Sequence, residues 1–109
     1  MELKYKLQIE DAVWDDLSRM DAYVRHALFN PSAADKLYVL IKSEMNDLVS
    51  MPKKFQVWIT LGEPLVEIRR RLVGNYSILY QVDDANGYVR VHGVFYSRRD
   101  MHELMRGRV

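Results

Sequence analysis

The sequence predicts an α+β fold in which a helical hairpin packs on one face of a mostly antiparallel sheet. Three observations lead to this prediction. A short stretch with period-two alternation opens the chain, two apolar stripes with helical spacing follow it, and three further alternating stretches close it. The expected order is strand, helix, helix and three strands. The length of 109 residues suits one domain, over residues 1–109, with one modest core.

The first elements are a strand and a helix. Residues 3–9 alternate, and the positions expected to point inward are Leu3, Tyr5, Leu7 and Ile9. Glu10 and Asp11 then open a helix, because acidic groups are favourable at the positive end of the helix dipole. The apolar stripe of this helix comprises Val13, Leu17, Met20, Val24 and Ala27.

A second helix follows after a very short connection. Asn30 and Pro31 end the first helix and begin the next, because proline suits a first helical turn and either Asn30 or Ser32 can cap it. Its stripe comprises Leu37, Leu40, Ile41, Met45 and Leu48. We therefore expect the two helices to lie antiparallel as a hairpin.

Three alternating stretches form the predicted meander, over residues 66–72, 76–82 and 88–96. Gly74-Asn75 makes the first tight turn, and Asn86-Gly87 is the strongest hairpin signal. The positions expected to face the helices are Val66, Ile68, Leu72, Tyr76, Ile78, Tyr80, Val82, Val89, Val91, Gly93 and Phe95.

Two segments are less regular. Residues 53–65 are either a short strand or a structured loop, and residues 101–105 are expected to add a short helical turn. Because the helices cover one face of the sheet, the other face should be at least partly open. The residues expected on this open face are Arg69, Arg71, Ser77, Gln81, Arg90, His92 and Tyr96.

The charge distribution indicates an acidic or polyanionic partner. The net charge is only +1, but residues 66–109 carry eight arginines against five acidic residues. Arginine presents a rigid fork of donors that fits phosphates and carboxylates. The alternative is a solvated charged face without a partner.

Composition also argues against several classes of protein. No apolar run approaches the ~20 residues that span a bilayer. Residues 1–10 alternate, unlike a signal peptide. There is no cysteine, and the three histidines lack a short-spaced ligand pattern, so we expect no metal, no cofactor and a cytoplasmic location.

Two blocks of sequence resemble the RelE/ParE toxin family. Residues 69–83 read RRRLVGNYSILYQVD, and residues 91–100 read VHGVFYSRRD. In that family a basic strand, a Gly-Asn-Tyr turn and an apolar strand ending in Tyr-x-Val-Asp precede a closing strand with Arg-Arg-Asp. The junction Asn30-Pro31 is similar as well. The family comprises toxins of type II toxin–antitoxin systems, also described as plasmid stabilisation system proteins.

The resemblance implies a growth inhibitor that a cognate antitoxin neutralises by wrapping around it. RelE-like members are ribosome-dependent endoribonucleases that cut messenger RNA without a metal, whereas ParE-like members inhibit DNA gyrase. Arg99 lies where the RNA-cleaving pattern has a phosphate-stabilising arginine, but Ser77 and Met105 stand where it has a further arginine and a tyrosine. The ParE-like activity is therefore favoured, and whether the chain is an enzyme stays open.

The resemblance and the predicted face together suggest site residues. His92 is a candidate base or acid, Tyr96 a stacking or proton-donating group, and Arg99 a phosphate ligand, although His92 and Tyr96 are also common packing residues. The candidates for binding RNA or a protein partner are Lys53, Lys54, Arg69, Arg71, Arg90 and Arg98. Asp100, which could fix an arginine, and Tyr76 are expected to give structural support. A homodimer and a toxin–antitoxin hetero-oligomer are the two assemblies considered, and the sequence leaves the choice open.

Overall fold

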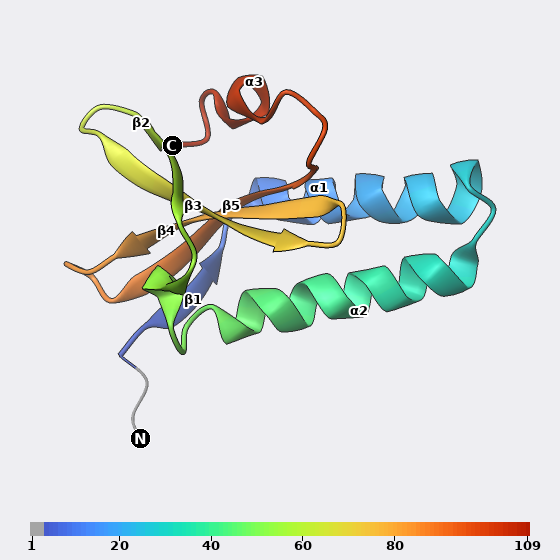
Figure 1. Ribbon diagram of the computed structural model, residues 1–109, viewed down its shortest axis with the longest axis horizontal. Coiled ribbons are helices and arrows are strands. Elements are labelled where there is room, and N and C mark those ends of the chain that lie inside the picture. Colours follow the sequence, from blue (N-terminus) through green and yellow to red (C-terminus); the bar gives the residue numbers. More distant parts are fainter. Residues whose placement is uncertain (1–3) are drawn as a thin grey trace.

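The computed structural model describes residues 4–109, which form a five-stranded sheet with helices on both of its faces (Figure 1). The elements are β1 (Lys6–Ile9), α1 (Asp11–Ala22), the π-helical turn η1 (Tyr23–Ala27), α2 (Pro31–Asp47), the 3-10 turn η2 (Pro52–Lys54), β2 (Val57–Leu61), β3 (Val66–Val73), β4 (Tyr76–Asp83), β5 (Tyr88–Tyr96) and α3 (Met101–Met105). Leu3, predicted to point inward, lies outside the described residues.

The sheet has the strand order β1-β5-β4-β3-β2. β1 runs parallel to β5, and the other neighbours are antiparallel. Figure 1 shows α1 and α2 side by side as an antiparallel hairpin. The predicted α+β fold is therefore confirmed, and the irregular segment before residue 66 contains a strand, β2. Within the described residues, no helix combines the length and the apolar character that crossing a membrane requires.

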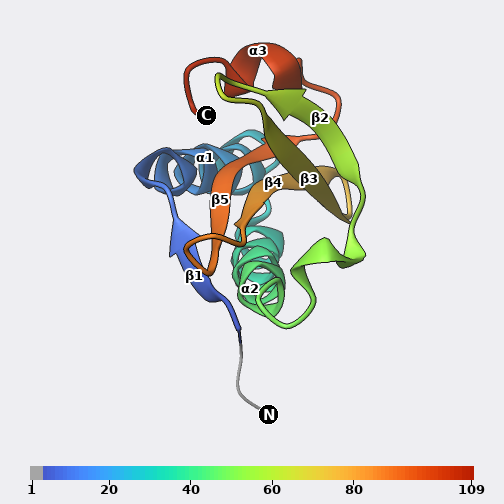
Figure 2. The same ribbon diagram turned by 90° about the vertical axis from the view of Figure 1, so that its left-hand side faces the viewer.

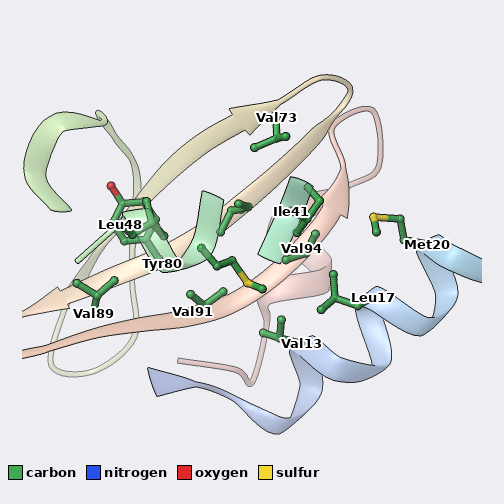
Figure 3. Packing of buried hydrophobic residues seen from close by; sticks show 12 residues of the cluster. Val13, Leu17, Met20, Ile41, Leu48, Val73, Tyr80, Val89, Val91 and Val94 are labelled. Carbon is green, nitrogen blue, oxygen red and sulfur yellow. The ribbon is translucent and has the colours of Figure 1, made fainter. Parts of the chain in front are cut away.

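The first core lies between the helical hairpin and the sheet (Figure 3). Its buried residues are Val13, Leu17, Met20, Ile41, Met45, Leu48, Val73, Ile78, Tyr80, Val89, Val91 and Val94. Most of the core residues that the helical hairpin contributes come from the predicted stripes, because side chains three and four positions apart lie on one helix face. Two predicted stripe residues, Ala27 and Leu40, are exposed instead.

A second core covers the opposite face of the sheet, so the prediction of an open face is wrong there. Its buried residues are Ile68, Leu79, Phe95, Met101 and Met105. Figure 2 shows α3 on the other side of the sheet from α2. Ile68 and Phe95 were predicted to face the hairpin and instead lie under α3.

Strand register explains the reversal in β5. Leu79 pairs with Gly93, but Tyr80 pairs with Val91, so His92 is an extra residue in β5 and forms a β-bulge. After the bulge the alternation is inverted. Val94 therefore faces the hairpin and Phe95 the second core, the opposite of the predicted arrangement.

Candidate functional site

The predicted arginines of β3 do not lie on an open face. Arg69 pairs with Tyr80 and Arg71 with Ile78, so both arginines lie on the hairpin side of the sheet. Arg69 donates a hydrogen bond to the main-chain oxygen of Phe55 at 2.6 Å. Arg71 forms an ion pair with Glu44 of α2 at 3.0 Å. Both side chains thus tie the edge of the sheet to the segments beside it.

The other predicted cations are also dispersed. Arg90 forms an ion pair with Asp83 and donates to Gln8 of β1 at 2.7 Å. Lys53 bonds Asp84 at 2.7 Å, and this hydrogen bond raises the pKa of Lys53. The prediction that strand alternation gathers the guanidinium groups on one uncovered surface is therefore wrong. Those of Arg69, Arg71 and Arg90 form hydrogen bonds or ion pairs with residues beside them.

His92 occupies an interior position. It is only 5% exposed, and its Nε2 lies 2.9 Å from Oε1 of Gln81. Its Nδ1 is buried without a hydrogen-bond partner among the described residues. Burial lowers the pKa of His92, with Arg90 and Arg108 acting in the same direction and Glu10 opposing them. In this position the ring is shielded from any substrate on the surface.

A buried ion pair beside His92 was not expected from the sequence. The side chain of Asp16 is 1% exposed and accepts hydrogen bonds from Arg108 at 2.6 and 2.9 Å. Asp16 also accepts from the main-chain nitrogen of Val94, while Arg108 donates to the main-chain oxygen of His92. The position of Asp16, three residues after Val13 on the apolar stripe, was the available signal.

This ion pair completes the edge of β5. Among residues 4–109, β1 pairs with Tyr88–Val91, and the later residues of β5 have no strand partner on that side. Asp16 accepts from the main-chain nitrogen of Val94, and Arg108 donates to the main-chain oxygen of His92. A neighbouring strand would otherwise bind these two main-chain groups. The Arg108 guanidinium also lies 4.8 Å from the centre of the Phe95 ring, which belongs to the second core.

Three of the predicted site residues, Tyr76, Tyr96 and Arg99, do meet, in a groove between α1–η1 and the adjoining ends of β4 and β5. The groove has a volume of about 540 Å³. Three tyrosines, Tyr23, Tyr76 and Tyr96, line it together with Arg19 and Arg99. We call it the tyrosine groove. It suits the binding of a ligand with apolar side chains and a negative charge.

Tyrosine contacts shape this groove. The rings of Tyr76 and Tyr96 lie 5.7 Å apart in a tilted arrangement. Burial raises the pKa of Tyr76, which packs against the first core. Tyr76 is thus partly buried against the first core, whereas Tyr96 is 38% exposed.

The Arg-Arg-Asp segment has divided roles. Arg98 and Arg99 are exposed and have no ion-pair partner within residues 4–109. Asp100 was expected to fix an arginine. Among the described residues it instead accepts a hydrogen bond from the main-chain nitrogen of Glu103. It therefore caps the first turn of α3.

Sequence reasoning missed Tyr23 and Leu28 of the groove.

Two departures from the RNA-cleaving pattern fall in the interior. Ser77 is fully buried, and its hydroxyl lies 2.7 Å from that of Ser97. Met105 is buried in the second core. Neither position opens to the surface.

No three metal-ligating side chains cluster anywhere in the part of the chain that the structure describes.

The sequence was compared with models of known protein families and with curated proteins. The family model described as "ParE toxin of type II toxin-antitoxin system, parDE" matches residues 7–101. No curated protein sequence matches the chain.

Three solved structures share the fold. The chromosomal ParDE system from P. aeruginosa has a TM-score of 0.69 at 12% identity, covering 87% of this chain and 98% of that chain. The archaeal RelE-RelB complex from Pyrococcus horikoshii OT3 has a TM-score of 0.58 at 21% identity, covering 88% and 98%. The RelBE2 toxin-antitoxin complex from Mycobacterium tuberculosis has a TM-score of 0.55 at 18% identity, covering 88% and 94%. Because the family model spans most of the sequence, the chain belongs to the ParE toxin family of type II toxin–antitoxin systems.

Proposed function

We propose that the chain is a cytoplasmic growth inhibitor that binds DNA gyrase, and that a cognate antitoxin neutralises it. Membership of the ParE family supports the toxin role. The similar solved structures, which are of a ParDE system and a RelE-RelB complex, support a protein antitoxin as partner. The observation that favours target binding over RNA cleavage is the burial of His92, the predicted base.

Cleavage of RNA through its 2′-hydroxyl requires a base, a cation near the phosphate and an acid for the leaving oxygen. His92, the predicted base, is buried and hydrogen-bonded to Gln81. Ser77 and Met105 stand in the interior where the cleaving pattern has an arginine and a tyrosine. Arg99 and Tyr96 remain together at the tyrosine groove, but they do not supply a base. A binding mechanism needs none of these groups.

The test compares the two activities in one set of samples. Purified chain is added to a gyrase supercoiling assay, and RNA 5′ ends are mapped after induction in cells. We expect inhibited supercoiling and unchanged RNA ends, with growth restored by co-expression of the neighbouring small open reading frame. His92→Gln, which keeps an amide able to bond Gln81, should inhibit growth as wild type does. Codon-dependent cuts that vanish in His92→Ala and Arg99→Ala, with gyrase unaffected, would establish the ribonuclease instead.

A further inference from the structure

The two edge strands of the sheet differ in how they are protected from pairing with another chain. β1 has four residues, and the exposed Lys6 within it follows the exposed Lys4. Short strands and lysines commonly protect an edge, because a charged side chain opposes the approach of a second strand. β2, at the other edge, has five residues, VWITL, and none of them is charged. Figure 2 shows β2 as the outermost strand on its side of the sheet, so this edge lacks the charge that β1 carries.

The outer side of β2 offers main-chain groups to a further strand. Its register shift lies at the start, between Val57 and Ile59, so the residues from Ile59 to Leu61 pair regularly with β3. Trp58, Ile59 and Leu61 pack against the second core, which fixes one face of the strand. Among the described residues no strand lies beyond β2. Its outward N–H and C=O groups can therefore extend the sheet by one more strand.

The charges beside β2 indicate which strand fits this edge. Lys54, shortly before the strand, and Glu63, shortly after it, are both exposed, and neither has an ion-pair partner within residues 4–109. Glu67 of β3, which is opposite Thr60, is exposed as well. The beginning of the β2 edge is thus positive and its end negative. Two antiparallel copies bring opposite charges together at both ends, whereas two parallel copies bring like charges together.

We propose that the β2 edges of two copies of this chain pair antiparallel, in a homodimer whose two five-stranded sheets form one continuous sheet. A two-fold axis makes such a contact self-complementary, because each protomer uses the same surface. Lys54 of one protomer then lies near Glu63 of its partner, at both ends of the contact. Val57 and Leu65, which are 39% and 75% exposed, lie beside this edge and add apolar surface that the dimer covers.

This dimer goes beyond the proposed function and does not depend on it. In the sheet, β3 and β4 separate β2 from β5, and the tyrosine groove lies at the adjoining ends of β4 and β5. None of the residues that line this groove belongs to β2. Each protomer of the dimer therefore keeps its groove open.

Sedimentation velocity of the purified chain over a series of concentrations tests the dimer. We expect wild type to show a reversible monomer–dimer equilibrium. Lys54→Glu and Glu63→Lys should each weaken association about tenfold or more, because each places like charges together at both ends of the contact. The double variant that carries both reversals should return to within about threefold of wild type, because the two sites are coupled across the contact.

Two further variants sharpen the test. Thr60→Lys adds a charge at an exposed position within the strand and should prevent the dimer. Lys36→Glu is the matched control, because it reverses an exposed lysine of α2 and changes the net charge by the same amount as Lys54→Glu. It should stay within about twofold of wild type, since residues outside an interface contribute little.

Three results would overturn the inference. The first is a wild-type monomer at every concentration; protection of the β2 amides from hydrogen exchange on adding the antitoxin would then assign the edge to that protein. The second is a dimer of equal stability in wild type, Thr60→Lys and both single reversals, with circular dichroism showing all of them folded. The third is a double reversal that associates as weakly as the single ones, since the two charges would then not meet across the contact.

Discussion

At the residue scale, the pair formed by Asp16 and Arg108 connects α1 to the segment that follows α3. A buried carboxylate is stable only when its hydrogen bonds are satisfied, and here Arg108 and the main chain of Val94 satisfy them. Removing Arg108 would leave the buried carboxylate with only the main chain of Val94 and Arg19, whose side chain is 65% exposed. The cost of that change should far exceed the loss of any surface ion pair.

We expect Arg108→Ala to lower the free energy of unfolding by about 3 kcal/mol, the effect typical of breaking a buried pair. Arg108→Lys keeps the charge but not the fork, so its loss should be intermediate. Arg106→Ala is the matched control, because its side chain is 79% exposed and its ion pair with Glu103 lies at the surface. Urea denaturation measures all three. Equal losses for Arg106→Ala and Arg108→Ala would contradict a buried, stabilising pair.

His92 should make stability depend on pH. Burial lowers its pKa below the ordinary value of 6.5, so the unfolded chain binds more protons than the folded chain between the two pKa values. The stability contributed by neutral His92 is therefore complete above that ordinary value and is lost as the pH falls through the folded pKa. Wild type should lose more stability between about pH 7.5 and 5.5 than His92→Gln, which cannot titrate. Parallel pH profiles for the two proteins would rule out this role.

At the element scale, local signals predicted most of the secondary structure. The expected starts at Asp11 and Pro31 are the first residues of α1 and α2. The three predicted strands of the meander agree with β3, β4 and β5 to within a residue at their ends. Helix caps, stripes and tight turns depend on residues close in sequence, which is why they could be read directly.

Two irregular elements could not be read in this way. The π turn of η1 has no residue pattern of its own, so Ala27 was wrongly placed on the helical stripe. The bulge at His92 did leave one signal, the glycine at position 93 in a strand. A Cβ at Gly93 would lie 2.5 Å from the Phe95 ring, so glycine allows that ring to pack over the bulged strand.

At the scale of the whole molecule, the second core explains why the candidate site was only partly predicted. Central strands with both faces covered have apolar residues on each side, so alternation does not reveal which set faces the helices. The segment over residues 101–105 is too short to show a stripe. Tyr96 and Arg99 were found through a sequence resemblance, whereas Tyr23 and Leu28 join them only through tertiary structure.

Three methionines allow the two cores to be compared with the same substitution. Met45 is buried in the first core, Met105 is buried in the second, and Met51 is 66% exposed. If α3 closes a true core, Met105→Ala should lower the free energy of unfolding by about 2–4 kcal/mol, similar to Met45→Ala, because both create an internal cavity. Met51→Ala should change it by less than about 0.5 kcal/mol.

Urea denaturation followed by circular dichroism gives these values on one scale. A loss for Met105→Ala as small as that for Met51→Ala would mean that α3 only rests on the sheet, and that the face under it opens readily. A loss equal to that of Met45→Ala would mean that both faces are needed for the folded state. In that case a partner cannot reach Leu79 without first unfolding α3, and the tyrosine groove on the hairpin side is the more accessible surface.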